Sequence, residues 1–190
     1  MPQIKNKTRC PWVRENPLYI KYHDQEWGVP VYKDDKIFEF LVLESAQAGL
    51  SWLTILKKRQ NYKKAFAGFD PVKVAKFNAK DFKRLMADAG IVRNKLKILA
   101  AINNAQRFLE VKKEFGTFSK YMWGFVSGKP IKHKIKTLKD YPVKIKEAED
   151  WAKDLKRRGF RFLGATICYA HMQAVGMVND HSVDCFKSRK

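Results

Sequence analysis

Two pairs of cysteine and histidine residues lie near opposite ends of the sequence. Cys10 and His23 are close to the N-terminus, and His181 and Cys185 are close to the C-terminus. The second pair has the His-x3-Cys spacing that places both side chains on one face of a helix, and Zn²⁺ is commonly bound by thiolates and imidazoles. Four protein ligands leave no coordination position for water or substrate. Such a zinc site would therefore be structural and would tie the two termini together.

The spacing alone leaves a plainer interpretation of these four residues open. Cysteine is often buried as a small apolar side chain, and a histidine can be a satisfied surface group. The other candidates are weaker: Cys168 lies in an apolar run, His133 lies among lysines, and His171 lies on a predicted helix. We expect none of these three to be a metal ligand.

A carboxylate on an apolar helical stripe is the second feature that suggests chemistry. Glu44 shares its stripe with Ile37, Leu41 and Ala48, and a buried carboxylate without a partner is unfavourable. A nucleobase whose exocyclic amine donates to Glu44 would compensate it, and aromatic rings could stack on such a base. The candidate aromatic residues are Trp12, Tyr19, Tyr22, Trp27 and Trp52. Periodicity also allows these rings to be core residues and Glu44 to cap a backbone group or pair with an arginine.

Helical periodicity dominates the elements that would position these residues. The pattern predicts helices over 37–48, from Ser51 onward, 71–77, from about 80 towards Gly90, 96–108, 118–126, 143–158 and 165–178. Asp70 before Pro71 is a typical helix start, and Gly49 and Gly159 are typical helix stops. No segment shows the alternation of a strand. The sequence therefore predicts an all-α fold, with one irregular segment over 127–141.

Composition limits the class of protein. With 190 residues, of which 45% are hydrophobic, the chain can bury the core of one domain over residues 1–190. The formal net charge of +20 favours a polyanionic partner, but a basic proteome would produce the same excess. Three cysteines cannot all pair with one another, so we do not expect a disulfide scaffold.

The sequence also bears on the compartment. No apolar stretch follows the N-terminal run 1–7, so the run does not resemble a signal peptide. The longest apolar stretch, over 37–56, is interrupted by charged and polar residues and is not a membrane span. We therefore expect a cytoplasmic protein with no membrane partner.

Several longer motifs together resemble those of a known family. These are Arg9-Cys10-Pro11-Trp12, residues 22–30, Leu43-Glu44 with Gln47-Ala48-Gly49-Leu50-Ser51-Trp52, residues 56–59, 69–75, 88–91 and 156–160, and Val178-Asn179-Asp180-His181. In this order they span nearly the whole chain and resemble 3-methyladenine DNA glycosylase I, the bacterial Tag family. The resemblance implies a helix-hairpin-helix DNA glycosylase fold with two helical lobes, and excision of 3-methyladenine from alkylated double-stranded DNA in base excision repair.

The resemblance also implies roles for individual residues. A structural Zn²⁺ would join the termini through Cys10, His23, His181 and Cys185. Glu44 would be the specificity residue that accepts hydrogen bonds from the damaged adenine, and we assign it the catalytic role as well. Tyr22 and Trp52 would line the same pocket, with Trp12 and Tyr19 as further lining residues. Trp27 fits equally well as packing beneath the metal loop.

The DNA contacts implied by the resemblance come from two turns. The hairpin lies near 80–108, and its turn at 88–91 would grip a phosphate through exposed backbone N–H groups, often with a bound monovalent cation. The hairpin candidates are Gly90, Ile91, Arg93 and Lys95. Gly49 and Leu50 would enter the duplex and fill the space left by the extruded nucleotide.

The mechanism expected from the resemblance begins with base flipping, which is least costly where methylation has weakened pairing. Residues 94–115 contain no aspartate, so we assign no separate general base and expect a monofunctional, monomeric enzyme. Residues 127–145 carry no family motif and are not expected to touch the pocket. The alternative is a zinc-stabilised nucleic-acid-binding module without enzymatic activity. A zinc hydrolase would need an open coordination position.

Overall fold

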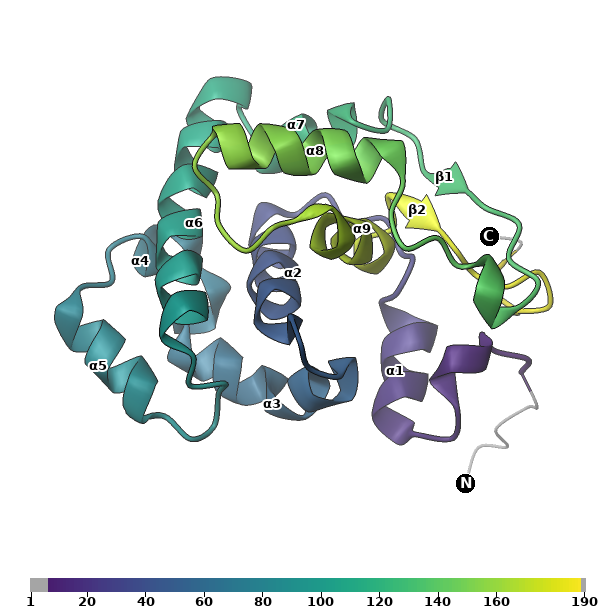
Figure 1. The fold of residues 1–190 in the computed structure, drawn as a ribbon, viewed down its shortest axis with the longest axis horizontal. Helices are drawn as coiled ribbons and strands as arrows, with labels where there is room; N and C mark the ends of the chain where they lie inside the picture. The colour runs from purple at the N-terminus through teal and green to yellow at the C-terminus, as the bar shows by residue number, and fades with distance from the viewer. Residues whose placement is uncertain (1–6, 189–190) are drawn as a thin grey trace.

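The structure is a computed structural model that describes residues 7–188, so residues 1–6 of the N-terminal run lie outside the described part. Its α-helices are α1 (Pro17–Gln25), α2 (Asp34–Gln47), α3 (Trp52–Ala65), α4 (Pro71–Val74), α5 (Ala79–Ala87), α6 (Lys95–Phe115), α7 (Phe118–Gly124), α8 (Lys146–Arg157) and α9 (Ala165–Ala174). Three short 3-10 helices are η1 (Pro11–Val13), η2 (Ala67–Phe69) and η3 (Leu138–Asp140). The fold is therefore mostly helical (Figure 1).

The helix starts follow the local chemistry of the sequence. The Ser51 side chain accepts a hydrogen bond from the backbone N–H of Thr54, and Asp70 accepts from the first turn of α4. Asn78 and Asp81 form a reciprocal capping box at the start of α5. These side chains accept hydrogen bonds from N–H groups that have no partner inside the helix, and so they fix where each helix begins. The predicted starts of α3, α4 and α5 are confirmed.

The prediction of an all-α fold is wrong in one detail. Strands β1 (Ile131–Lys132) and β2 (Val178–Asn179) form a parallel pair in which Ile131 lies opposite Val178. Two residues are too few for strand alternation to be visible in the sequence. The predicted helices over 71–77 and 165–178 are correspondingly too long, because α4 ends at Val74 and α9 ends at Ala174. Helix α1 was not predicted.

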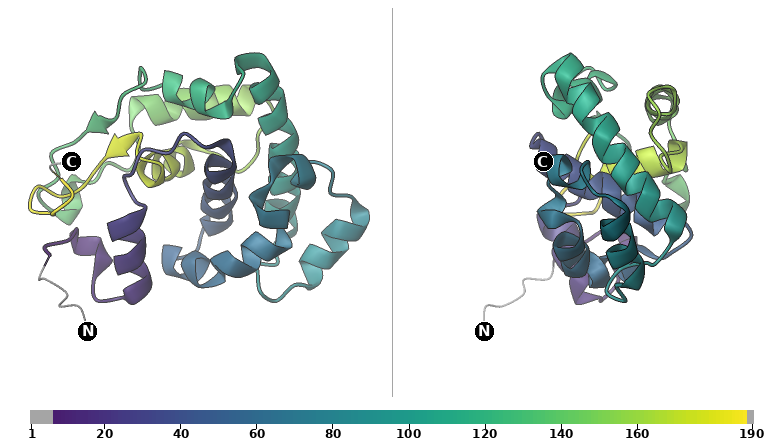
Figure 2. Two further views of the ribbon diagram at one scale, coloured as in Figure 1. Left: turned by 180° about the vertical axis from the view of Figure 1, so that it is seen from behind. Right: turned by 90° about the vertical axis from the view of Figure 1, so that its left-hand side faces the viewer.

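Helix α2 lies in the middle of the molecule, and most of residues 37–46 are buried. It packs against α3, α6, α7 and α9, and the long helix α6 in turn contacts α4, α5 and α7. The views from behind and from the side in Figure 2 show α2 enclosed in this way. None of the described helices combines the length and apolar character of a membrane span.

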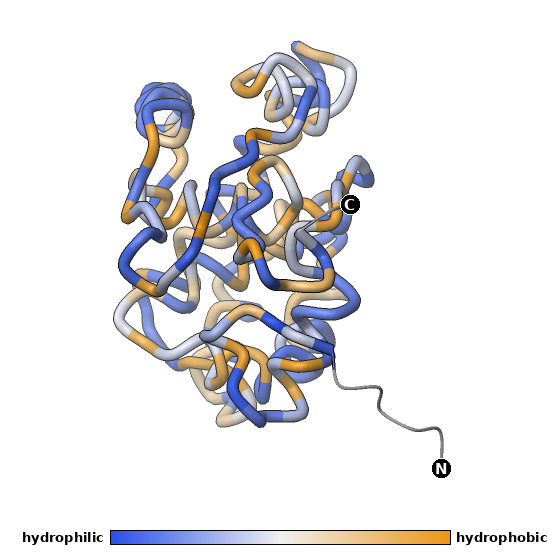
Figure 3. Tube along the Cα trace, turned by 90° about the vertical axis from the view of Figure 1, so that its right-hand side faces the viewer, coloured by the Kyte–Doolittle hydropathy of each residue, from blue (hydrophilic) through white to orange (hydrophobic). Residues whose placement is uncertain are grey.

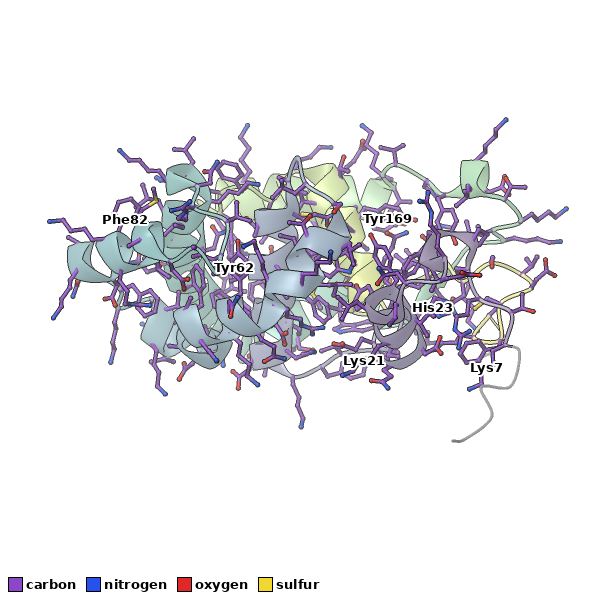
Figure 4. The ribbon with its side chains drawn as sticks, turned by 90° about the horizontal axis from the view of Figure 1, so that it is seen from below. Lys7, Lys21, His23, Tyr62, Phe82 and Tyr169 are labelled. Atoms are coloured by element: carbon purple, nitrogen blue, oxygen red, sulfur yellow. The ribbon has the colours of Figure 1, made fainter. Side chains whose placement is uncertain are left out.

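The two ends of the described chain lie side by side. The backbone N–H of Phe186 donates to the carbonyl of Thr8 at 3.0 Å, and the Lys7 ammonium lies 4.8 Å from the centre of the Phe186 ring. Figure 4 shows Lys7, and also His23 on α1, beside the C-terminal loop, which is drawn in yellow. This arrangement places the N-terminal and C-terminal Cys/His pairs in one region.

Candidate functional site

The four predicted metal ligands converge into one cluster. All are buried, and the ligand atoms of Cys10, His23, His181 and Cys185 lie within 4.8 Å of one another. The Cys10 sulfur is 3.4 Å from His181 Nδ1, and the Cys185 sulfur is 3.4 Å from His23 Nε2. Tetrahedral Zn²⁺ with metal–sulfur and metal–nitrogen bonds of about 2.3 and 2.0 Å would place sulfur and nitrogen roughly 3.5 Å apart. The donor set therefore fits a four-coordinate metal ion.

Groups around the cluster fix the orientation of the ligand side chains. His23 Nδ1 is 2.8 Å from an oxygen of Asp24, which leaves Nε2 directed at the cluster. His181 uses Nδ1 there, because its Nε2 lies 3.3 Å from the carbonyl of Trp27. Such partners set the tautomer of a metal-binding histidine. The plainer interpretation, in which the two histidines are surface groups, is wrong, because His23 and His181 are buried.

The electrostatics of the cluster favour a thiolate. The hydrogen bond from Cys185, together with those from His181 and His23, outweighs burial and lowers the pKa of the Cys10 thiol. The backbone N–H of Ser182 donates to the Cys10 sulfur, and the N–H of Lys187 donates to the Cys185 sulfur. These N–H donors stabilise negative charge on sulfur, which is the form that binds a metal ion.

Gly28 and Trp27 support the cluster from one side. Gly28 has a φ of +71°, and a Cβ atom at this position would lie 2.8 Å from His181 Nε2. Only glycine adopts this backbone conformation at no cost and leaves room for the imidazole. The Trp27 ring packs on His181 at 4.7 Å and on Trp12 at 4.9 Å between ring centres. Trp27 thus lies between the Cys/His cluster and a neighbouring cavity.

That cavity has a volume of about 370 Å³ and is built by five separate parts of the chain. Its lining residues are Trp12, Tyr19, Tyr22, Trp27, Glu44, Gln47, Trp52, Leu138, Tyr141, Ala170 and Gln173. The structure therefore brings together all five aromatic residues singled out in the sequence, and it places Glu44 among them. Trp27 both lines the cavity and packs on the metal cluster.

Glu44 is buried in this cavity without a partner. Its side chain is 3% exposed, Oε2 is buried without a hydrogen-bond partner, and no hydrogen bond or ion pair joins its carboxyl group to another described residue. Burial raises the pKa of Glu44 to about 8. Arg59 of α3 pairs with Glu26 and Glu39 and not with Glu44. The interpretation of Glu44 as a capping or ion-paired residue is therefore wrong.

The rings around Glu44 form a continuous wall. Tyr22 lies 5.3 Å from Trp52 and 6.4 Å from Trp12, measured between ring centres, and Trp12 meets Tyr19 edge-on at 5.7 Å. Burial, together with the neighbouring Glu44, raises the pKa of Tyr22. The indole N–H groups of Trp12 and Trp52 are buried and have no acceptor among the described residues. A flat ligand that offers acceptors as well as donors would satisfy these groups.

Sequence reasoning missed several lining residues. Gln47 lies one helical turn after Glu44, so its position on the same face of α2 was visible in the sequence. Leu138 and Tyr141 come from the segment 127–145, and the prediction that this segment does not touch the pocket is wrong. Their position depends on the pairing of β1 with β2, which brings residues 131 and 178 together.

The predicted DNA-binding hairpin connects α5 to α6, but its turn differs from the expectation. The backbone N–H of Gly90 donates to the Asp88 carboxylate at 2.7 Å, and the N–H of Ile91 donates to the Asp88 carbonyl at 3.3 Å. Both N–H groups therefore already have partners within the hairpin, and a phosphate contact through them stays a prediction. Ile91 is also buried, whereas Arg93 and Lys95 are exposed and form no ion pair with another described residue.

The same turn is held by α3. The Lys58 ammonium donates to the carbonyl oxygens of Ala89 at 3.0 Å and Gly90 at 3.4 Å, and the Asn61 amide also donates to Gly90. A Cβ atom on Gly90 would lie 3.0 Å from Asn61. The Asp88 carboxylate oxygen would lie even closer to this Cβ atom, at 2.8 Å, so glycine leaves room for both the Asp88 and the Asn61 side chains. The Lys58 ammonium thus places a positive charge at two carbonyl oxygens of the turn.

The turn between α2 and α3 projects beside the mouth of the cavity. Gly49 has a φ of +77°, and Leu50 is 40% exposed although it is apolar. Lys97 of α6 donates to the carbonyls of Ala46 and Ala48 at 2.8 and 2.5 Å and so fixes the end of α2. The turn holds an apolar side chain in solvent next to Gln47 and Trp52, which line the cavity.

Comparisons with known proteins agree with this arrangement. The methyladenine glycosylase family model matches residues 12–188. DNA-3-methyladenine glycosylase 1 of Escherichia coli (strain K12) is 49% identical over 177 residues, which cover 93% of this chain and 95% of the relative. DNA-3-methyladenine glycosylase of Haemophilus influenzae is 47% identical over 178 residues, covering 94% and 96%.

Solved structures are similar as well. The crystal structure of a 3-methyladenine DNA glycosylase I (TAG) has a TM-score of 0.92 and 46% identity, covering 95% of this chain and 99% of the other. The Staphylococcus aureus enzyme, described for its recognition of 3-methyladenine, has a TM-score of 0.92 and 40% identity, covering 96% and 97%. With the family match over most of its length, the chain belongs to the methyladenine glycosylase family.

Proposed function

We propose that this protein is a monofunctional DNA glycosylase that excises 3-methyladenine from alkylated DNA by hydrolysing the N-glycosidic bond. The observation that carries the proposal is Glu44, a buried carboxyl group without a protein partner in an aromatic cavity. The names of the two curated relatives and the solved S. aureus structure support the choice of 3-methyladenine as substrate.

The charge of the substrate explains why a carboxyl group is suited to this cavity. Methylation at N3 makes the adenine base in DNA cationic. The bound base is therefore the positively charged partner that the Glu44 carboxylate lacks in the free protein. Its exocyclic amine also offers N–H donors to the carboxylate. Binding a cation favours the ionised form of Glu44 and therefore lowers its pKa from about 8. Ordinary adenine is neutral and would leave the buried carboxylate without this charge partner.

The aromatic wall holds the flipped base. Stacking between the rings of Tyr22, Trp52 and Trp12 places the base against Glu44 and excludes solvent from one side of the pocket. Because the glycosidic bond of the cationic base is already labile, positioning of the base and stabilisation of the developing charge on the sugar can suffice for hydrolysis by water. Glu44 is the one carboxylate among the lining residues, so we assign no separate general base.

The DNA duplex would lie across the turns that surround the pocket. We assign Leu50, raised on Gly49, to the space that the flipped nucleotide vacates in the stack. Arg93 and Lys95, exposed where the hairpin enters α6, would contact phosphates, while Gly90 and Ile91 shape the hairpin backbone. On this proposal residues 1–190 form a single helix-hairpin-helix glycosylase domain of two lobes, which acts on double-stranded DNA as a monomer.

We assign the Cys/His cluster to Zn²⁺. When bound, the ion supplies a structural link between Cys10 and His23 at one end of the chain and His181 and Cys185 at the other. The cluster offers four protein ligands, so it leaves no open position for a water nucleophile. This is why we do not favour a zinc hydrolase.

A nucleic-acid-binding module without enzymatic activity is the alternative. In such a module a buried, unpartnered Glu44 would have no role, and an apolar residue at this position would make the folded protein more stable. The decisive experiment incubates the protein with methylated duplex DNA and identifies the bases released. We expect free 3-methyladenine from the wild-type protein and little from Glu44→Gln, which keeps the size of the side chain. Glu110→Gln, on the exposed side of α6, is the matched control and should release the base normally.

A further inference from the structure

Residues 131–139 form a segment that we name the basic strap. It runs alongside the C-terminal segment in parallel register: the N–H of Ile131 donates to Met177 at 2.9 Å, and the N–H of His133 donates to Asn179 at 3.2 Å. Further along, the N–H of Val183 donates to the carbonyl of Ile135 at 2.8 Å. The strap is therefore fixed to the part of the chain that carries the metal ligand His181.

Residues of the basic strap alternate between inward and outward positions. Ile135 is buried, and His133 turns inward to the buried Asp180, with 2.7 Å between His133 Nδ1 and the carboxylate. The residues that alternate with them are all exposed: Lys132, Lys134 and Lys136. In extended backbone, every second side chain lies on the same face at intervals of about 6.6 Å. The strap thus presents a regularly spaced row of ammonium groups on a fixed backbone.

These lysines have no counter-charge within ion-pair distance among residues 7–188. Asp140 directs its carboxylate to the backbone N–H groups of Lys136 and Thr137, and the Lys136 ammonium acts on it electrostatically from beyond ion-pair distance. By contrast, Lys144 and Lys146, just beyond the strap, pair with Glu149 and Asp150. The positive charges of the strap lysines are therefore not neutralised by ion pairs with described acidic side chains, unlike those of Lys144 and Lys146.

The basic strap leads to the rim of the base pocket. It enters η3, where Leu138 lines the pocket although 60% of it is exposed, and Tyr141 follows inside the pocket. In Figure 1, η3 and the turn between α2 and α3 lie on opposite sides of α1. Figure 3 faces the side that carries the strap, which crosses the surface as a mainly hydrophilic tube with short hydrophobic stretches.

We propose that the basic strap is a second DNA-backbone contact, which binds phosphates flanking the flipped nucleotide on the side of the pocket away from Leu50. This inference rests on the proposed function, since it takes DNA as the partner. The carrying observation is the row of unpaired lysines beside a pocket rim formed by Leu138. Because the strap is already ordered, binding costs little chain entropy, and each phosphate contact releases counterions from the DNA.

Salt dependence of DNA binding tests the proposal. The strap variant replaces Lys132, Lys134 and Lys136 by glutamine, and the control variant replaces the exposed Lys113, Lys120 and Lys153, which lie on α6, α7 and α8. Affinity for an undamaged 25-base-pair duplex is measured over a series of KCl concentrations. The log-log slope should fall by about 0.9 for each lost contact in the strap variant and much less in the control.

The controls separate this proposal from the proposed function. A second variant, in which arginine replaces Lys132, Lys134 and Lys136, should have the wild-type slope, because arginine keeps the positive charges. Equal slopes for the strap and control variants would overturn the strap proposal even if the wild-type protein releases 3-methyladenine. If the wild-type protein releases no 3-methyladenine, the glycosylase assignment is contradicted. A slope that falls only in the strap variant would in that case still support the strap as a DNA contact.

Discussion

Gln173 donates a hydrogen bond through Nε2 to Asp180 at 2.6 Å. An ionised carboxylate only accepts hydrogen bonds, so this contact fixes the side-chain amide with its N–H₂ group towards Asp180. Asp180 is itself buried and also accepts from the hydroxyl of Tyr169 and from His133. Gln173 lines the pocket, and its side-chain carbonyl oxygen accepts no hydrogen bond from another residue of 7–188, so it can accept one from a bound base.

Gln173→Leu should weaken binding of 3-methyladenine about tenfold, the loss expected for one neutral hydrogen bond of roughly 1.4 kcal/mol. Fluorescence titration of the pocket tryptophans measures this affinity. Gln106→Leu is the control, because Gln106 bonds to Ala75 outside the pocket. Unchanged affinity in Gln173→Leu would show that the carbonyl oxygen does not contact the base.

Glu44→Gln should stabilise the folded protein at alkaline pH. The ordinary pKa of the carboxyl group, 4.5, is raised to about 8 by burial, so the folded state holds its proton more tightly than the unfolded state. The stability linked to this proton is fully present below pH 4.5 and is lost as the pH rises to 8. By linkage the loss is at most about 5 kcal/mol. Urea unfolding at pH 5 and pH 8 should show the variant gaining stability relative to wild type only at the higher pH.

Base excision should accelerate with pH up to about 8. The cationic substrate requires an ionised Glu44, and the free protein must lose a proton from this group before it accepts the cation. The kcat/KM for methylated duplex should therefore fall by up to tenfold for each pH unit below 8. A profile that is flat between pH 6 and 8 would mean that Glu44 does not titrate in this range.

Whether a feature was predictable depended on how far apart in the sequence its interacting residues lie. Helix starts such as Ser51 and Asp70 are local, and the structure confirms them. The Cys/His cluster was found because its ligand types are unusual and few. Leu138 was missed because its position at the pocket depends on a two-residue strand pair, which leaves no periodic signal.

The hairpin shows a different limit of sequence reasoning. The sequence correctly indicated a turn at Gly90, but it did not show that Asn61 packs against this glycine or that its N–H bonds to Asp88. A sequence cannot show which partner a backbone N–H has already found in the fold. For the same reason the lack of any partner for Glu44 became visible only in three dimensions.

Gly28→Ala should weaken metal binding. The added Cβ would lie 2.8 Å from His181 Nε2, and the φ of +71° is unfavourable for alanine. Displacing a histidine ligand from its supporting hydrogen bond is expected to reduce zinc affinity by about 10- to 100-fold. Competition with a chromophoric chelator measures the affinity. Gly124→Ala on α7 is the control, since an added Cβ atom there would meet no described residue within 4 Å apart from its chain neighbours and its own helix backbone, and equal zinc affinity in the two variants would contradict the prediction.

Lys58→Met should make DNA binding depend on potassium. In the wild-type protein the Lys58 ammonium holds the carbonyl groups of Ala89 and Gly90, so the hairpin carries its own cation. Without it, two carbonyls lose a charged donor and the turn that presents Arg93 loosens, while the base pocket is untouched. We expect weaker duplex binding in choline chloride, partial recovery in KCl at the same ionic strength because K⁺ binds carbonyl oxygens, and unchanged affinity for free 3-methyladenine. Lys57→Met, one residue away and exposed on α3, should show none of these effects. Equal binding of Lys58→Met in the two salts would mean that the ammonium only packs against the turn.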